Sequence, residues 1–336
     1  MQFGKYAFSC VFEDEAILPE YKGSTFRGVF GYALKKIVCA LKRQTCDGCF
    51  LRSRCLYALV FEKSSQEIGK QLSCNSPVNN IDRQKSRIAA SPNPYVIEPP
   101  VTEKTHFLPG DRFDFQLILF GPVNDALPYF IYAFEQVGQA GIGRKIRGRQ
   151  ARFSLRKVSS GPHPIYNEKD RKVEGGPFAD DLHLDPSSFT GGKGMGHSVS
   201  TVDLTLALQT PLRLKFENRL QAELPFHVLV RAMLRRVSAL SSAYGNGEPL
   251  LDYRGLVNRA TKAAVVRNEL CWFDWRRYSN RQDREMLMGG LIGNVTYRGS
   301  IEEFLPLIRF CEKTHLGKQT AFGLGKIEMI PSCSSG

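Results

Sequence analysis

Four cysteines near the N-terminus have the spacing of metal ligands. Cys39, Cys46, Cys49 and Cys55 lie within 17 residues, in the pattern C-x6-C-x2-C-x5-C. Four thiolates, with one pair separated by only two residues, can surround a tetrahedral Zn²⁺ or hold an iron–sulfur cluster. Because thiolates would fill every position, no open position would remain for a substrate. The pattern therefore predicts a structural metal site that clamps an insertion after the first helix.

A glycine-rich stretch near the C-terminus combines a bending backbone with titratable and cationic side chains. It reads H-L-G-K-Q-T-A-F-G-L-G at 315–325 and contains His315, Gly317, Lys318, Gly323 and Gly325. Glycine is the residue most costly to order, so the cluster indicates a backbone that bends sharply or approaches another group closely. Histidine titrates near neutral pH, which suits proton transfer.

Arginine and lysine gather in a second glycine-containing stretch. Residues 141–157 read G-I-G-R-K-I-R-G-R-Q-A-R-F-S-L-R-K, with seven cations and no acid. Cations on a glycine-rich backbone are what phosphate contact needs. The alternative is a solvated loop beside a basic strand, and the clustering of charge favours binding. The predicted contacts are Arg144, Lys145, Arg147 and Arg149.

Two further clusters could contact nucleic acid. His227, Arg231 and Arg235 are spaced by four and share one face of an expected helix, which is more often an ordinary solvated face. The stretch W-F-D-W-R-R-Y-S-N-R-Q at 272–282 interleaves aromatic residues with arginines, a combination that can stack bases and grip phosphates. The alternative is a strand that places Trp272 or Trp275 in the core.

Composition limits the class of protein. The chain has 336 residues, 42% of them hydrophobic, which is enough for two packed cores and excludes wholesale disorder. The net charge of +13 indicates a polyanionic partner. No apolar run approaches a membrane span, and the N-terminus does not read as a signal peptide. Nine cysteines without a secretion signal predict reduced thiols in the cytoplasm.

The two halves of the chain show the same order of elements. In the first half the periodicities predict strands at 5–12, 112–120 and 151–158 and helices at 24–41 and 123–137. In the second half they predict strands at 202–208, 271–277, 291–298 and 320–330 and helices at 225–241 and 301–311. Each half reads as β-α-β-β-α-β, with a glycine-rich loop before its last strand. We therefore predict an α+β fold of tandem ferredoxin-like (RRM-like) domains.

The expected boundaries follow from this pattern. The N-terminal domain spans 1–158 and carries the cysteine insertion at 39–93. Residues 159–200, rich in glycine and proline, form a linker or insertion, and the C-terminal domain spans 201–336.

Several of these stretches resemble one family. F-R-G-V-F-G-Y-A-L at 26–34 and the C-x2-C-x5-C-L-Y-A-L-V-F-E run that ends at Glu62 resemble the N-terminal region of CRISPR-associated RAMP-superfamily endoribonucleases. R-Y-S-N-R-Q at 277–282, G-G-L-I-G at 289–293 and the loop at 315–325 resemble their C-terminal region. The resemblance implies metal-independent cleavage of precursor CRISPR RNA within its repeats. It also implies that the glycine-rich loops contact RNA, here through Gly317, Lys318, Gly323 and Gly325.

Such cleavage would use the RNA's own 2′-hydroxyl as the nucleophile, with one group acting as base and another as acid. The products would be a 2′,3′-cyclic phosphate and a 5′-hydroxyl. Many members carry a catalytic histidine near the first helix, whereas the first histidine here is His106. We therefore favour His315, which stands where the loop pattern often has glycine, slightly over His227. Tyr278 and Arg277 are the candidates for positioning the scissile phosphate.

Two other classes of protein remain open. The chain could be a non-catalytic RNA-binding RAMP subunit that works with other subunits of a CRISPR effector complex, and the missing histidine favours this alternative. A cysteine-clamped RNA-binding protein of an unrelated pathway would explain only the charge and the aromatic residues.

Overall fold

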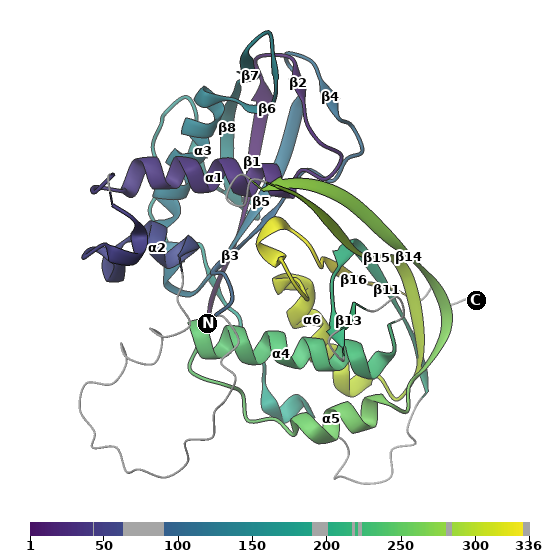
Figure 1. The fold of residues 1–336 in the computed structure, drawn as a ribbon. Helices are drawn as coiled ribbons and strands as arrows, with labels where there is room; N and C mark the ends of the chain where they lie inside the picture. Colours follow the sequence, from purple (N-terminus) through teal and green to yellow (C-terminus); the bar gives the residue numbers. More distant parts are fainter. Residues whose placement is uncertain are drawn as a thin grey trace, which may run out of the picture.

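The structure is a computed structural model that describes residues 1–42, 44–62, 91–189, 201–216, 219–220, 224–279 and 284–331. Two antiparallel sheets, one from each half of the chain, are covered by helices (Figure 1). The prediction of an α+β fold is confirmed. No helix in the described ranges is long and apolar enough to cross a membrane.

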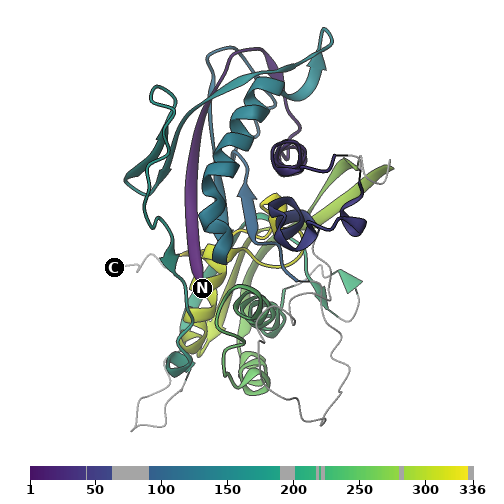
Figure 2. The same cartoon turned by 90° about the vertical axis from the view of Figure 1, so that its left-hand side faces the viewer.

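The N-terminal sheet is built from strands whose alternate residues are apolar. Its strand order is β3-β5-β1-β8-β9, comprising β1 (Gln2–Phe12), β3 (Tyr95–Glu98), β5 (Arg112–Phe120), β8 (Phe153–Ser160) and β9 (His163–Asn167). Helices α1 (Gly23–Val38) and α3 (Leu127–Ala140) pack against it, and α3 runs alongside β1 in Figure 2. Aromatic residues fill this core: the Phe8 and Phe115 rings stack with centroids 4.8 Å apart.

The C-terminal sheet has the strand order β14-β15-β11-β16. Its elements are β11 (Val202–Leu212), α4 (Phe226–Tyr244), α5 (Tyr253–Ala260), β14 (Ala264–Ser279), β15 (Arg284–Gly299), α6 (Leu305–Thr314) and β16 (Ile327–Ile330). Leucine and valine on α4 recur at helical spacing and pack into its core, together with residues of α5 and α6. The β14–β15 hairpin rises from this sheet to the level of α1 (Figures 1 and 2).

The two halves share one connectivity. In each, the four main strands numbered in chain order lie in the sheet as 4-1-3-2, which is β8-β1-β5-β3 in the first half and β16-β11-β15-β14 in the second. One helix follows the first strand, and another follows the third. The second strand of the first half, β3, is absent from the sequence prediction because it is only four residues long and is buried throughout.

Shorter elements complete the described fold. They are β2 (Ala16–Ile17), α2 (Leu56–Phe61), β4 (His106–Phe107), β6 (Ile142–Ile146), β7 (Arg149–Ala151), β10 (Asp180–Asp181), β12 (Lys215–Phe216), β13 (Arg219–Leu220) and six 3-10 turns. The strands β9 and β10 extend the first sheet from within the predicted linker at 159–200. The strand predicted at 320–330 is wrong in its first part. Residues Thr320–Phe322 form a 3-10 turn, and positive φ angles at Gly323 and Gly325 delay β16 to Ile327.

The two cores exchange residues at the junction of the halves. Ala321, from the C-terminal loop, belongs to the N-terminal core. Phe3, Val96, Ile118 and Phe120, from the N-terminal sheet, belong to the C-terminal core. The loop at 315–325 is therefore packed into the N-terminal half.

Candidate functional site

The junction of the two halves contains a buried charged cluster centred on His315. The His315 side chain is completely buried. Its Nε2 lies 2.8 Å from Oε1 of Glu98 on β3, and its Nδ1 lies 3.0 Å from the carbonyl oxygen of Leu324. A carbonyl oxygen can only accept, so Nδ1 donates to Leu324, and Nε2 faces the Glu98 carboxylate, so that both ring nitrogens have partners.

Glu98 is held ionised by the cations around it. Burial by itself would raise the pKa of Glu98, but the hydrogen bond and charge of His315, followed by the charges of Lys326 and Lys5, lower it to about 2. Lys326 Nζ lies 3.4 Å from Oε1, and Lys5 Nζ lies 3.5 Å from Oε2. One buried carboxylate thus joins a strand of the first half to the loop of the second.

This environment gives His315 a structural role. A ring with no exposed surface and with both nitrogens occupied reaches no RNA phosphate in this conformation. It also has no free nitrogen with which to act as a base. The geometry therefore argues against His315 as the residue that transfers a proton to or from RNA. Its backbone has φ 60° and ψ 159°, a conformation that costs about 1–3 kcal/mol outside glycine, so the surrounding contacts must hold it in place.

The glycines of the same loop approach protein backbone rather than open space. A Cβ at Gly323 would lie 2.5 Å from the Ile97 carbonyl oxygen, and one at Gly325 would lie 1.7 Å from that of Leu316. The Gly323 amide donates to the Thr320 carbonyl. The Gly325 amide donates to the Pro211 carbonyl oxygen, and both glycines are buried. The predicted phosphate contacts of Gly323 and Gly325 are thus not available here, because their amides already have partners.

Gly317 and Lys318 lie on the outer part of the loop. Gly317 is half-buried and Lys318 is exposed. The Lys318 amide donates to the Arg213 carbonyl oxygen at 3.0 Å, so the loop runs beside the end of β11. Of the residues predicted to contact RNA in this loop, only this pair has a surface from which to do so.

A cavity of about 460 Å³ lies beside the charged cluster, between the two halves. From the first half it is lined by Tyr21, Lys22 and residues 98–103, and from the second by 209–211 and Lys326, among others. Apolar walls with a few converging polar groups, in a volume of this size, are typical of ligand-binding pockets. Burial lowers the pKa of Lys22, whose Nζ donates to the carbonyl oxygens of Glu20 and Thr102.

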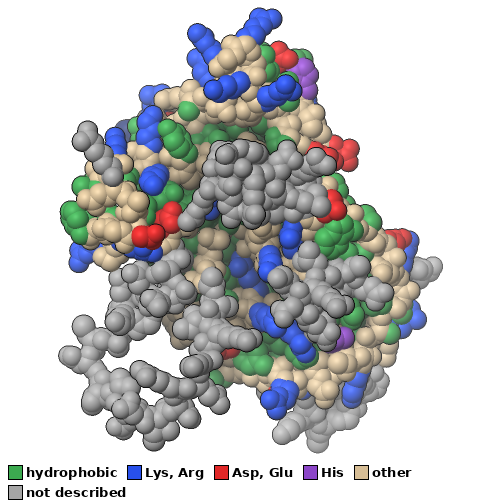
Figure 3. All heavy atoms as spheres, in the orientation of Figure 1, with side chains coloured by type: hydrophobic (Ala, Val, Ile, Leu, Met, Phe, Trp, Pro, Cys, Tyr) green, Lys and Arg blue, Asp and Glu red, His purple; other side chains and the backbone are tan. Residues whose placement is uncertain are grey.

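The hairpin β6–β7 carries the basic stretch on an exposed surface. Arg147 and Gly148 have φ 50° and 83°, the two positive values of a type I′ turn, and they join Ile146 to its partner Arg149. The side chains of Arg144, Lys145, Arg147 and Arg149 are all exposed. Lys and Arg gather at the top of Figure 3, over β6 and β7 of Figure 1.

The remaining cations of 141–157 are partly neutralised, which the sequence could not show. Arg152 Nε lies 2.9 Å from Oδ2 of Asp14, and Arg156 pairs with Glu168. Both acids come from outside the stretch. The basic surface is therefore concentrated at the tip of the hairpin rather than spread along β8.

The basic face of α4 is only partly as predicted. Arg235 is exposed, whereas His227 and Arg231 are half-buried. Arg236, one residue further on, is buried and donates to the carbonyl oxygens of Thr314 and His315 at 2.6 and 3.1 Å. Burial lowers the pKa of Arg236 to about 10, and its charge caps the C-terminal end of α6.

Arg277 and Tyr278 lie near the end of β14, where their backbones pair with Met286 and Glu285 of β15. Their side chains fall outside the described part of the structure, so their predicted roles stay predictions.

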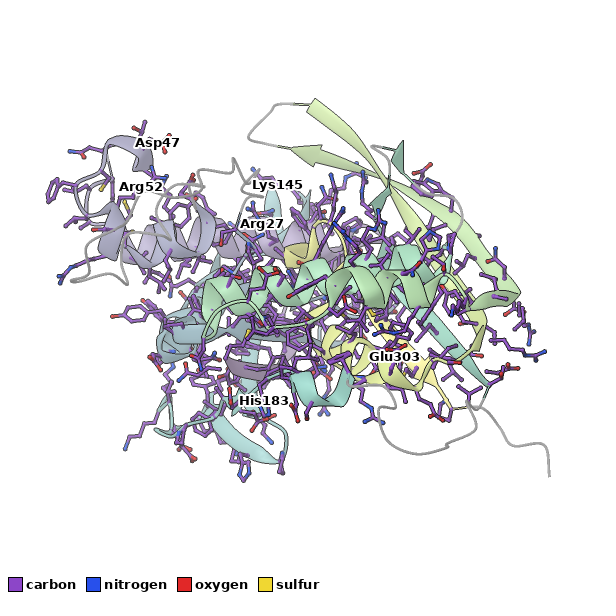
Figure 4. The ribbon with its side chains drawn as sticks, turned by 90° about the horizontal axis from the view of Figure 1, so that it is seen from below. Arg27, Asp47, Arg52, Lys145, His183 and Glu303 are labelled. Carbon is purple, nitrogen blue, oxygen red and sulfur yellow. The ribbon has the colours of Figure 1, made fainter. Side chains whose placement is uncertain are left out.

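The four cysteines of the insertion line one small cavity. Cys39, Cys46, Cys49 and Cys55 surround about 20 Å³ at the end of α1, together with Arg52 among others. Burial raises the pKa of the Cys46 thiol. Arg52 Nη1 lies 2.7 Å from Asp47 Oδ1, and the two side chains face one another at the far end of the insertion in Figure 4. Across the described residues, however, no three or more His, Cys, Asp or Glu side chains are placed to hold a metal ion.

Two residues of the junction gave no signal in the sequence. Glu98 is one carboxylate in a short apolar strand, and only its distant partner His315 marks it as important. Arg236 follows Arg235 in the sequence, and nothing in the local pattern distinguishes it from its exposed neighbour. Its burial depends on the α6 carbonyls that it reaches across 78 and 79 residues of sequence.

Comparison with known families identifies both halves. A model of an N-terminal domain, AF_1859_N, matches residues 1–178, and the model of the CRISPR-associated endoribonuclease Cas6 matches residues 206–327. The chain therefore belongs to the family defined by the AF_1859_N N-terminal domain, and its second half is similar to the CRISPR-associated endoribonuclease Cas6. An uncharacterized protein of Archaeoglobus fulgidus is 25% identical over 312 residues, which are 92% of this chain and 91% of that protein.

Solved structures share the fold at low sequence identity. A partial Cas6-RT-Cas1–Cas2 complex has a TM-score of 0.57 and 12% identity, covering 99% of this chain but only 46% of that one. This chain thus spans less than half the length of that one. A Thermus thermophilus Cas6 in a product complex has a TM-score of 0.52 and 13% identity, covering 98% of this chain and all of that one.

Proposed function

We propose that the protein is an endoribonuclease that cleaves precursor CRISPR RNA within its repeats. The observation that carries this function is the exposed basic hairpin β6–β7 in a chain whose other half matches the Cas6 endoribonuclease model. Four exposed cations on a hairpin with a two-residue turn can track an RNA backbone. The relatives that share this fold include a Cas6 solved in a product complex.

We further propose that the chain is a pair of tandem ferredoxin-like, RRM-like domains. The 4-1-3-2 strand order, present twice, supports this. The proposed limits are 1–158 with the insertion at 39–93, 159–200 as the connecting segment, and 201–336. RNA would contact the β6–β7 hairpin of the first domain. In the second it would contact Gly317, Lys318 and the exposed side of α4 at Arg231 and Arg235.

The cleavage step needs no metal in this proposal. A base removes the proton of the RNA 2′-hydroxyl, whose oxygen attacks the adjacent phosphorus, and an acid protonates the departing 5′-oxygen. The products are a 2′,3′-cyclic phosphate and a 5′-hydroxyl. With His315 enclosed, His227 becomes the first candidate for proton transfer, because it is half-buried at the start of α4 rather than fully buried. Tyr278 and Arg277 remain the candidates for positioning the phosphate.

The test uses purified protein, excess EDTA and a labelled repeat RNA. A matched substrate carries a single 2′-deoxy nucleotide at the cut. One cut that leaves a cyclic phosphate and is prevented by the deoxy nucleotide supports the proposal. Tight binding with no cleavage in any metal condition contradicts it. His227→Ala should then reduce single-turnover cleavage by about 10²–10⁴-fold with little change in RNA affinity.

The second candidate is a non-catalytic RNA-binding subunit of a CRISPR effector complex. The burial of His315 favours it, because one of the two histidine candidates is removed from the surface. RNA that stays intact while the protein co-purifies with further effector subunits would support this alternative.

We also propose that the four cysteines bind Zn²⁺ or an iron–sulfur cluster with a structural role. The donor set fits a tetrahedral thiolate site, and all four thiols line the same cavity. Their positions do not already form a site, so a metal would have to draw the thiolates inward. Metal analysis of protein purified anaerobically, compared with the Cys46→Ser/Cys49→Ser variant, tests this. Reduced thiols also fit the proposed location, the cytoplasm.

A further inference from the structure

An aromatic side chain on the β14–β15 hairpin, Trp272, belongs to neither hydrophobic core. Trp272 is 39% exposed, although tryptophan is among the most apolar surfaces a protein can bury. The sequence left open whether Trp272 packs in the core or faces a ligand. With this exposure it is not a core residue.

The indole of Trp272 is held in one orientation. Its Nε1 donates to Oδ1 of Asp274 at 2.8 Å, two residues further along the same face of β14. The residue paired with Asp274 on β15 is Gly289. A Cβ at Gly289 would lie 2.6 Å from Trp272 Nε1 and 2.8 Å from Cε2, so the ring rests directly against the β15 backbone. The absence of a side chain at 289 is what lets the ring occupy that place.

The carboxylate that holds this ring interacts with one cation, Arg213. Asp274 acts electrostatically on Arg213, whose pKa is lowered by burial and raised by Asp274. The Arg213 carbonyl oxygen accepts the Lys318 amide, and a Cβ at Gly317 would lie 2.6 Å from the same oxygen. Arg213 thus connects the two features: its charge interacts with Asp274, and its backbone holds the exposed part of the glycine-rich loop. The negative charge of Asp274 would repel a phosphate, but the positive charge of Arg213 offsets it.

We propose that Trp272 is a stacking platform for an unpaired base of the bound RNA. This inference rests on the proposed function for its RNA partner. A flat ring fixed on one side by backbone and by one hydrogen bond loses little freedom when a base stacks on the ring surface that remains accessible. Every nucleobase presents a π face, so the platform would tolerate any base, while the cations nearby take the adjoining phosphates.

Fluorescence gives a direct readout, because the chain has only two tryptophans. The Trp275→Phe variant leaves Trp272 as the sole tryptophan, which is excited selectively at wavelengths that tyrosine does not absorb. Titration with repeat RNA, and separately with an unstructured oligoadenylate, should quench and shift its emission in step with binding. An emission that stays constant while the RNA is demonstrably bound overturns the proposal.

Affinity separates stacking from charge. Trp272→Ala should weaken RNA binding roughly 5- to 150-fold, and Trp272→Phe should retain part of the affinity. Because a stacked base releases no counterions, the slope of log K against log salt should stay the same in both variants. Lys318→Ala is the contrasting variant, and it should lower that slope. Val266→Ala, on the same strand and 44% exposed, is the matched control and should bind as the parent does.

Gly289→Ala tests the geometry independently. Its Cβ would lie 2.0 Å from Asp274 Oδ1, so the indole must move off the strand. The emission of Trp272 should then change without RNA, and affinity should fall. If Trp272→Ala binds RNA as tightly as the parent and cleaves the repeat normally, the stacking proposal is wrong and the proposed nuclease function still holds. If oligoadenylate quenches the Trp272 emission but repeat RNA is not cleaved, the stacking proposal is supported and the proposed nuclease function is wrong.

Discussion

Replacing His315 by alanine should destabilise the protein rather than disable its chemistry. The substitution removes the hydrogen-bonded partner of Glu98 Oε1 at 2.8 Å and leaves a carboxylate that is 95% buried. Removing one partner of a buried ion pair typically costs about 3–5 kcal/mol. The lowered pKa of Glu98 gives a second measure of this loss of stability. Its fall from 4.5 to about 2 corresponds to roughly 3 kcal/mol, shared among His315, Lys326 and Lys5. We expect a loss of about 2–3 kcal/mol, because the two lysines remain.

The backbone of His315 provides an internal comparison. At φ 60° and ψ 159°, glycine is unstrained and alanine is not. His315→Gly should therefore be about 1 kcal/mol more stable than His315→Ala, although it removes one more carbon. His163→Ala, at an exposed histidine on β9, is the control and should change the free energy of unfolding by less than about 0.5 kcal/mol.

The assay is urea denaturation, followed by repeat cleavage at a temperature where all variants are folded. The reasoning is refuted if His315→Ala is as stable as the parent and yet loses cleavage by the 10²–10⁴-fold expected of a proton-transfer group. That outcome would mean that the ring leaves Glu98 in the RNA complex and takes part in catalysis.

Four further outcomes are expected. Because Glu98 has a depressed pKa, its stabilisation is complete above about pH 4.5 and is lost as the pH falls toward 2; Glu98→Gln should flatten this part of a stability–pH curve. Gly325→Ala, whose Cβ would lie 1.7 Å from the Leu316 carbonyl oxygen at φ 74°, should lower the melting temperature by several degrees. Arg236→Leu leaves two α6 carbonyls without their donor and should cost about 2–4 kcal/mol in urea denaturation, and a loss below 1 kcal/mol would contradict the capping role. Replacing the four exposed cations of the β6–β7 hairpin by alanine should reduce the salt slope of RNA binding by up to about 3 with an unchanged melting curve, and an unaltered slope would exclude this hairpin from the interface.

The sequence predicted the elements that have strong local periodicity. The apolar face of α4 and the alternation in β5 are visible without any knowledge of the fold, and the basic tip at Arg144–Arg149 follows from charge clustering alone. These features depend on neighbours in the sequence. Their prediction therefore needed no tertiary information.

The role of the glycine-rich loop could not be predicted in the same way. Glycine marks a close approach but not the identity of the approaching group, which here is the Ile97 carbonyl for Gly323 and the Leu316 carbonyl for Gly325. A histidine among glycines and lysines reads as a catalytic residue until Glu98 is found beside it. That neighbour is set by the docking of one half on the other, which has no local signature.

The exchange of residues between the two cores also constrains the order of events during synthesis. Glu98 and His315 are 217 residues apart, and Ala321 fills part of a core formed mainly by residues 6–166. At about 5–20 residues per second, a ribosome needs roughly 10–40 seconds to deliver the second partner after the first. During that interval the nascent N-terminal half carries the Glu98 carboxylate without its His315 partner, and a gap where Ala321 will pack. The folding of that half on the ribosome is therefore completed only when the segment that contains His315 and Ala321, close to the C-terminus, arrives.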